Sequence, residues 1–121
     1  MSSVYNRWTG ERPRVVLMRP LRNVSEVMVR EVLLGLEEEG VPVVVQEGNG
    51  DAEELGHQAA RLSPLEVGIG LDGQGKAVIH HCKLRRHQPV FTAHLNLRPE
   101  AARVVGTNAA RLVKVLPFKP L

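Results

Sequence analysis

The sequence has few aromatic residues and a single cysteine. Phe, Trp and Tyr together make up 3% of the chain, which is too few to stack on the bases of a single-stranded nucleic acid. Cys82 has no second cysteine with which to form an internal disulfide, as expected for a protein of the reducing cytosol. The two shortages argue against a disulfide-stabilised secreted domain and against a stacking surface for RNA or DNA.

Long hydrophobic runs are missing as well. No stretch of about 18 apolar residues occurs, so the sequence predicts no membrane-spanning helix. The first residues are polar and lack the apolar core of a secretory signal peptide. The net charge is +3, and the basic residues are scattered rather than clustered, apart from a short run at residues 83–87 that we interpret as a solvated loop. We therefore expect a cytoplasmic protein with neither a membrane nor a nucleic acid as partner.

Catalytic and phosphate-binding motifs are equally scarce. The sequence contains no G-x-x-x-x-G-K-[ST] loop, so we expect no nucleotide to bind this chain. Gly68, Gly70 and Gly73 do spell G-x-G-x-x-G, but they fall on a predicted strand and a tight turn, and a second strand follows instead of a helix. We interpret these glycines as serving the turn and close packing. The sequence predicts no catalytic residue.

His80, His81 and Cys82 are metal ligands by residue type. Because neighbouring residues of a strand point to opposite faces, only His80 and Cys82 would be able to share an ion. No second ligand pair stands at the spacing of a zinc site, which favours structural roles for these residues. Cys82 also lacks an accompanying pattern that would activate it as a nucleophile.

A length of 121 residues suits one domain, which we place at residues 14–121 after a mobile arm at residues 1–13. Strands are predicted over residues 14–18, 41–46, 65–71, 76–81 and 90–94. Helices are predicted over residues 23–39, from Asp51 to the Ser63–Pro64 stop, and from Pro99 onward. The alternation followed by a hairpin predicts an α/β fold with a mixed, mostly parallel sheet of about four to five strands covered by helices.

The helix predicted over residues 23–39 ends in three glutamates. Asn23 and Glu26 suggest a capping box at its start, and Gly40 ends it. The carboxyl end of a helix carries partial negative charge, so an exposed anion there is disfavoured by roughly 0.3–1 kcal/mol. A cation or a cationic partner surface would resolve this conflict.

The same helix has two faces of different character. Met28, Val29, Val32 and Leu36 form the broader apolar face, which we expect to cover the sheet. A second, semi-apolar face is predicted to bind a partner; it consists of Val27, Glu31, Leu34, Gly35 and Glu38. A glycine at mid-helix costs roughly 1 kcal/mol relative to alanine, and close approach by another chain is one reason to tolerate it. A solvated acidic face with a packing glycine is the alternative.

Three blocks of the sequence resemble the small subunit of the reactivating factors for adenosylcobalamin-dependent diol and glycerol dehydratases. They are REVLLGLEEEGVP at residues 30–42, GDAEELGHQAARLSPLEVGIGL at residues 50–71 and NAARLVKVLPF at residues 108–118. The blocks occur in the family's order and are spread over most of the chain. The first thirteen residues and the basic loop around Arg85 carry no resemblance.

The resemblance implies a non-catalytic subunit of a chaperone. Such a subunit joins a large ATPase subunit, and two large and two small chains would form the complex. The complex releases damaged cobalamin from inactivated dehydratase, and the small subunit gives up its place to the dehydratase medium subunit, which it resembles in fold. In the family a glutamate two positions before the helix-ending glycine helps hold a divalent metal at the subunit junction. That position is Glu38 here, and Mg²⁺ shared with the large subunit is the implied cofactor.

Other interpretations stay open at this point. The chain could be a medium subunit, or a fragment, of the dehydratase itself, which binding to a dehydratase large subunit would reveal. It could also be a small nucleic-acid-binding α/β module, whose affinity for RNA would fall steeply with added salt. The resemblance does not distinguish a diol from a glycerol dehydratase as client, and it leaves open whether the chain resides in a bacterial microcompartment.

Overall fold

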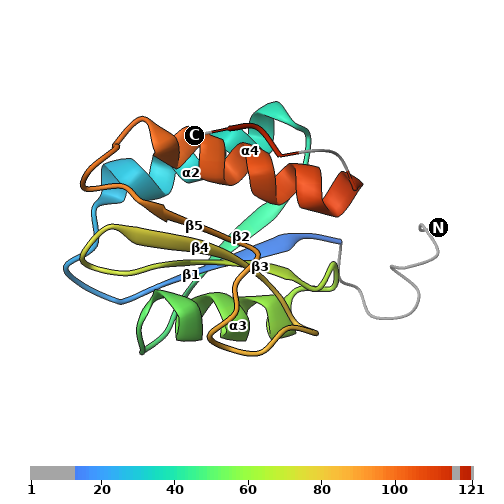
Figure 1. Cartoon of the computed structure of the whole chain (residues 1–121), viewed down its shortest axis with the longest axis horizontal. Helices are drawn as coiled ribbons and strands as arrows, with labels where there is room; N and C mark the ends of the chain where they lie inside the picture. The colour runs from blue at the N-terminus through green and yellow to red at the C-terminus, as the bar shows by residue number, and fades with distance from the viewer. Residues whose placement is uncertain (1–12, 116–117, 121) are drawn as a thin grey trace.

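The structure, a computed structural model, describes residues 13–115 and 118–120 and has three layers. Helices α2 and α4 cover one face of a five-stranded sheet, and α3 covers the other (Figure 1). The elements follow the chain as β1 (Val15–Arg19), α2 (Glu26–Glu38), β2 (Val43–Glu47), α3 (Ala52–Leu62), β3 (Val67–Leu71), β4 (Lys76–His81), β5 (Phe91–His94) and α4 (Ala101–Lys114). In this part of the chain, none of the helices is long and apolar enough to cross a bilayer. The predicted N-terminal arm lies almost entirely outside the described residues.

The strands are ordered β2-β1-β3-β4-β5. β1 pairs in parallel with β2 and β3, whereas β4 runs antiparallel to both of its neighbours. Four strands therefore share one direction and only β4 opposes them, which confirms the predicted mixed α/β sheet. The reversal arises from the hairpin turn at residues 72–75, where the Asp72 carboxylate accepts hydrogen bonds from two backbone N–H groups.

The core lies on both faces of the sheet because β1 and β3 are central strands. Leu17 and Ile69 pack on the side of α2 and α4, while Val16 and Met18 pack toward α3, as the alternation of a strand requires. The apolar face predicted for α2 is confirmed: Val29, Val32 and Leu36 are buried and the partly buried Met28 packs against the same core.

The glycines of β3 allow α3 to approach the sheet closely. A Cβ atom on Gly68 would lie 2.1 Å from the Ala60 backbone nitrogen, and one on Gly70 would lie 2.1 Å from the Ala52 carbonyl oxygen. Both distances are far below van der Waals contact, so no larger residue fits. This geometry confirms that the G-x-G-x-x-G pattern serves packing.

The N-terminal caps of α2 and α3 show where the local sequence signals predicted the helix starts correctly and where they did not. Asp51 and Glu54 form the predicted capping box of α3, with hydrogen bonds of 2.8 and 2.9 Å. Asn23, by contrast, is not the N-cap of α2; it lies in the preceding loop with a φ of 64°. Ser25 takes the cap position, and its hydroxyl accepts a hydrogen bond from the Met28 N–H. The predicted N-cap of this helix was therefore too early by two residues.

Asp51→Ala is expected to lower the free energy of unfolding by about 1 kcal/mol, because it leaves the first-turn N–H groups of α3 without their carboxylate acceptor. Urea denaturation followed by circular dichroism measures the change. Asn49→Ala, at an exposed loop position just before the helix, is the control and should change stability by less than half as much. Equal losses for the two variants would contradict a specific cap.

Candidate partner and metal site on helix α2

The acidic end of α2 faces two basic residues of α4. The Arg103 guanidinium bridges two carboxylates, with Nη2 2.9 Å from Glu31 Oε1 and Nη1 2.9 Å from Glu38 Oε2. Lys114 Nζ lies 3.6 Å from Glu39 Oε1 and also donates to the Glu39 backbone carbonyl. The cations that balance the charge of the helix end thus come from the same chain, and neither a metal nor a partner is needed for that purpose.

Gly35 also needs a correction. It is buried, and a Cβ atom on it would lie 2.3 Å from the Arg103 carbonyl oxygen and 2.7 Å from the Thr107 backbone nitrogen. The close approach that explains this glycine is therefore made by α4, not by another chain. Gly35 belongs to the intramolecular crossing of the two helices, and it is not available as a partner contact.

The other residues of the predicted partner face remain at least partly accessible. Val27 is 71% exposed, and Leu34 is half-buried. The Glu38 side chain is 57% exposed and that of Glu31 36%. An interface formed by these four residues stays a prediction, with Arg103 added to it because it holds both carboxylates in place.

Glu38 fits a shared metal site only as one ligand. Its Oε2 faces Arg103, and its exposed carboxylate offers oxygen to an ion that approaches from solvent. Among the described residues, the group of three or more metal-ligating side chains close enough to share an ion lies elsewhere and does not include Glu38. Because Mg²⁺ takes six oxygen ligands, this chain would supply a minority of them.

The histidines and the cysteine at the end of β4 take different roles. His80 is fully buried, and its Nε2 lies 2.8 Å from the Arg86 carbonyl oxygen, which confirms a structural role. Burial and the neighbouring His80 lower the pKa of His57. Burial, followed by the nearby Glu66 carboxylate, raises the pKa of the Cys82 thiol. Because the thiolate is the reactive form, a raised pKa argues against Cys82 as a catalytic nucleophile.

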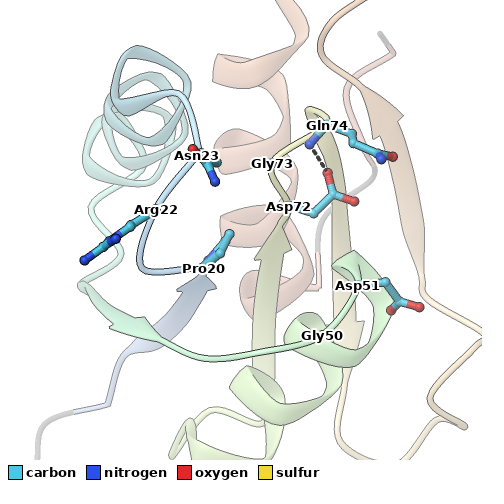
Figure 2. A pocket seen from close by; sticks show the side chains of 8 residues that line it. All are labelled: Pro20, Arg22, Asn23, Gly50, Asp51, Asp72, Gly73 and Gln74. Carbon is cyan, nitrogen blue, oxygen red and sulfur yellow. Dashed lines mark hydrogen bonds between the residues drawn. The ribbon is translucent and has the colours of Figure 1, made fainter.

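A pocket lies beyond the carboxyl ends of β1 and β3, where α/β folds commonly bind ligands. It measures about 410 Å³, and Figure 2 shows its wall of loop residues, among them Arg22, Asp51 and Asp72. Asp51 is occupied as the cap of α3, and Asp72 as the acceptor of the hairpin turn. Two carboxylates beside the helix N-terminus would repel a phosphate, so this geometry does not favour a dinucleotide site at Gly73.

Comparisons with known proteins agree with this architecture. The family model described as dehydratase medium subunit matches residues 12–119. A propanediol dehydratase-reactivating factor small subunit from Salmonella typhimurium is 47% identical over 92 residues, which are 75% of this chain and 78% of that protein. A diol dehydratase-reactivating factor small subunit from Klebsiella michiganensis is 46% identical over 93 residues, or 76% and 74% of the two chains. The chain belongs to the family of dehydratase-reactivating factor small subunits.

Solved structures of reactivating factors share the fold. A glycerol dehydratase reactivase chain superposes with a TM-score of 0.81 at 39% identity and covers 90% of this chain and 98% of its own length. A diol dehydratase-reactivating factor complexed with ADP and Mg²⁺ gives the same TM-score and identity, with 91% and 100% covered. The sequence thus matches the family model of the dehydratase medium subunit and also reactivating-factor small subunits. Both matches are expected if the small subunits resemble the dehydratase medium subunit.

Proposed function

We propose that this chain, with a large ATPase subunit, forms a reactivating factor that releases damaged cobalamin from inactivated diol or glycerol dehydratase. The identity of 46–47% to reactivating-factor small subunits, over three quarters of the chain, carries this proposal. Under this proposal, the chain is a non-catalytic subunit of a cytoplasmic complex of two large and two small chains. ATP is hydrolysed by the large subunit.

Subunit exchange would follow from the shared fold. The dehydratase medium-subunit model matches nearly the whole described chain, which supports a similar fold for the two proteins. The small subunit would dissociate from the large subunit, and the dehydratase medium subunit would take its position there. This exchange would loosen the dehydratase and open a path through which the damaged cofactor leaves. The accessible residues of α2 (Val27, Glu31, Leu34 and Glu38) and Arg103 of α4 would contact the large subunit.

Mg²⁺ would join the subunits at Glu38. A relative's structure was obtained as a complex with ADP and Mg²⁺, which supports a role for this ion in the assembled factor. Carboxylate oxygen suits the ion, and the exposed Glu38 side chain is accessible to a partner. The remaining oxygens would come from the large subunit and water, so the isolated chain should bind Mg²⁺ weakly.

Reconstitution tests the proposal. Dehydratase inactivated during turnover should recover activity when ATP, Mg²⁺, fresh adenosylcobalamin, the large subunit and this chain are all present. Omission of this chain should reduce the recovery to background. The pure chain alone should hydrolyse no ATP, because it carries neither a phosphate-binding loop nor a catalytic set. A chain that instead completes an active dehydratase in place of its medium subunit would support the alternative assignment and contradict this one.

A further inference from the structure

The side chains of Glu66, His81 and Cys82 converge at the end of the β3–β4 hairpin farthest from its turn. One ligand atom from each residue lies within 4.8 Å of the other two. His81 Nε2 is 3.8 Å from Glu66 Oε1, and the Cys82 N–H donates a 3.1 Å hydrogen bond to the Glu66 carbonyl oxygen. The proposed reactivating function uses none of these three side chains.

Strand register explains why the three residues meet. Val67 pairs with His81 in the antiparallel ladder, so Glu66 and Cys82 lie opposite each other just outside it. Alternation would place His81 and Cys82 on opposite faces, but Cys82 follows the last residue of β4 and belongs to the turn. The chain direction also changes at Glu66, which has a φ of 66°. His80, which strand alternation places on the same face as Cys82, is buried instead, with its Nε2 2.8 Å from the Arg86 carbonyl oxygen.

The donor set indicates the type of ion. Sulfur, imidazole nitrogen and carboxylate oxygen together suit Zn²⁺, which binds four ligands at about 2.0–2.3 Å, whereas Mg²⁺ prefers oxygen alone. The side chains of His81 and Glu66 are 27% and 47% exposed, so an ion can enter from solvent and water can fill the fourth position. We propose that Glu66, His81 and Cys82 form a zinc site that joins the start of β3 to the end of β4.

Coordination would change the protonation of His81. Its Nδ1 accepts a 3.2 Å hydrogen bond from the Lys83 N–H, so the neutral ring carries its proton on Nε2, the atom that faces Glu66. A zinc ion on Nε2 places the ring proton on Nδ1 and so breaks the exposed hydrogen bond from the Lys83 N–H, while the Cys82 thiol binds the ion as thiolate and gives its proton to solvent. Ligands of one tetrahedral ion lie about 3.5 Å apart, so the three side chains also close slightly around the metal.

Cobalt titration tests the site on the full, untagged chain. Co²⁺ replaces Zn²⁺ in tetrahedral sites, and a thiolate ligand then gives a charge-transfer band in the near ultraviolet. Because Cys82 is the chain's single cysteine, such a band reports this site alone. We expect the band to appear with Co²⁺, to disappear when Zn²⁺ is added and to persist in excess Mg²⁺. Nitrogen-15 spectra should show the His81 tautomer reversing with zinc.

Matched variants distinguish a built site from a reactive thiol. Cys82→Ser should abolish the band, and Glu66→Gln or His81→Gln should weaken metal binding by about tenfold or more. His94→Gln alters an exposed histidine away from the cluster and should leave binding unchanged. Circular dichroism confirms that each variant is folded. Absence of the band, or a band that survives Glu66→Gln and His81→Gln at full strength, would overturn the site without affecting the reactivating-factor assignment.

Discussion

Gly106→Ala is expected to lower the free energy of unfolding by about 3 kcal/mol, the upper end of what an extra methyl group costs in a packed core. Its Cβ would lie 1.9 Å from the Val32 carbonyl oxygen and 3.1 Å from the Gly35 Cα atom. A backbone carbonyl cannot rotate away as a side chain would, so α2 and α4 must separate. Alanine's higher helix propensity offsets only about 1 kcal/mol of this loss. Urea denaturation measures the result.

Gly40→Ala is the matched control for this variant. A Cβ atom there meets no other atom within 4 Å, but the residue has a φ of 75°, so the substitution should cost only about 1 kcal/mol of left-handed backbone strain. A loss at Gly106 no larger than that at Gly40 would contradict a tight helix crossing. Gly35→Leu should prevent stable folding, because even its Cβ atom would lie 2.3 Å from the Arg103 carbonyl oxygen.

Glu38→Gln is expected to weaken Mg²⁺ binding by the assembled reactivating factor by at least about tenfold, with a matching loss of large-subunit binding. This expectation depends on the proposed function. Glutamine keeps the size of the side chain and removes the charge that attracts a hard dication. The fold should persist, because the Glu38 side chain is 57% exposed and an exposed ion pair, such as the one with Arg103, contributes about 1 kcal/mol or less to the free energy of unfolding. Isothermal titration of the complex with Mg²⁺ provides the measurement.

Two controls separate a metal ligand from other roles of Glu38. Glu37→Gln removes the same charge from an exposed neighbour that points about 100° away around the helix, and it should change binding little. Arg103→Gln breaks the ion pairs with Glu31 and Glu38 but keeps both carboxylates. Equal losses for Glu37→Gln and Glu38→Gln would indicate a diffuse acidic surface. Equal losses for Arg103→Gln and Glu38→Gln would indicate that the ion pair, and not a metal, organises the interface.

The elements of the fold were predictable because their signals are local. Short apolar runs, apolar residues at helical spacing, the Asp51–Glu54 box and the turn before Lys76 each act over a few neighbouring positions, and the structure reproduces the strands and helices they predict. The start of α2 was missed because Asn23 and Ser25 are both good caps, and the sequence does not show which one lies at the helix end. The family was also visible locally, as three blocks in order.

What the sequence determined by itself was the order of elements, the mixed sheet and the family. The tertiary structure decided which groups meet across the chain. Arg103 reaches Glu38 over a separation of 65 residues, and α4 fills the space beside Gly35, so the helix crossing decided which cation faces Glu38 and what Gly35 packs against. The Glu66, His81 and Cys82 cluster likewise depends on strand register and on where β4 ends. Spacing along one element specifies a face, but only packing between elements determines what that face contacts.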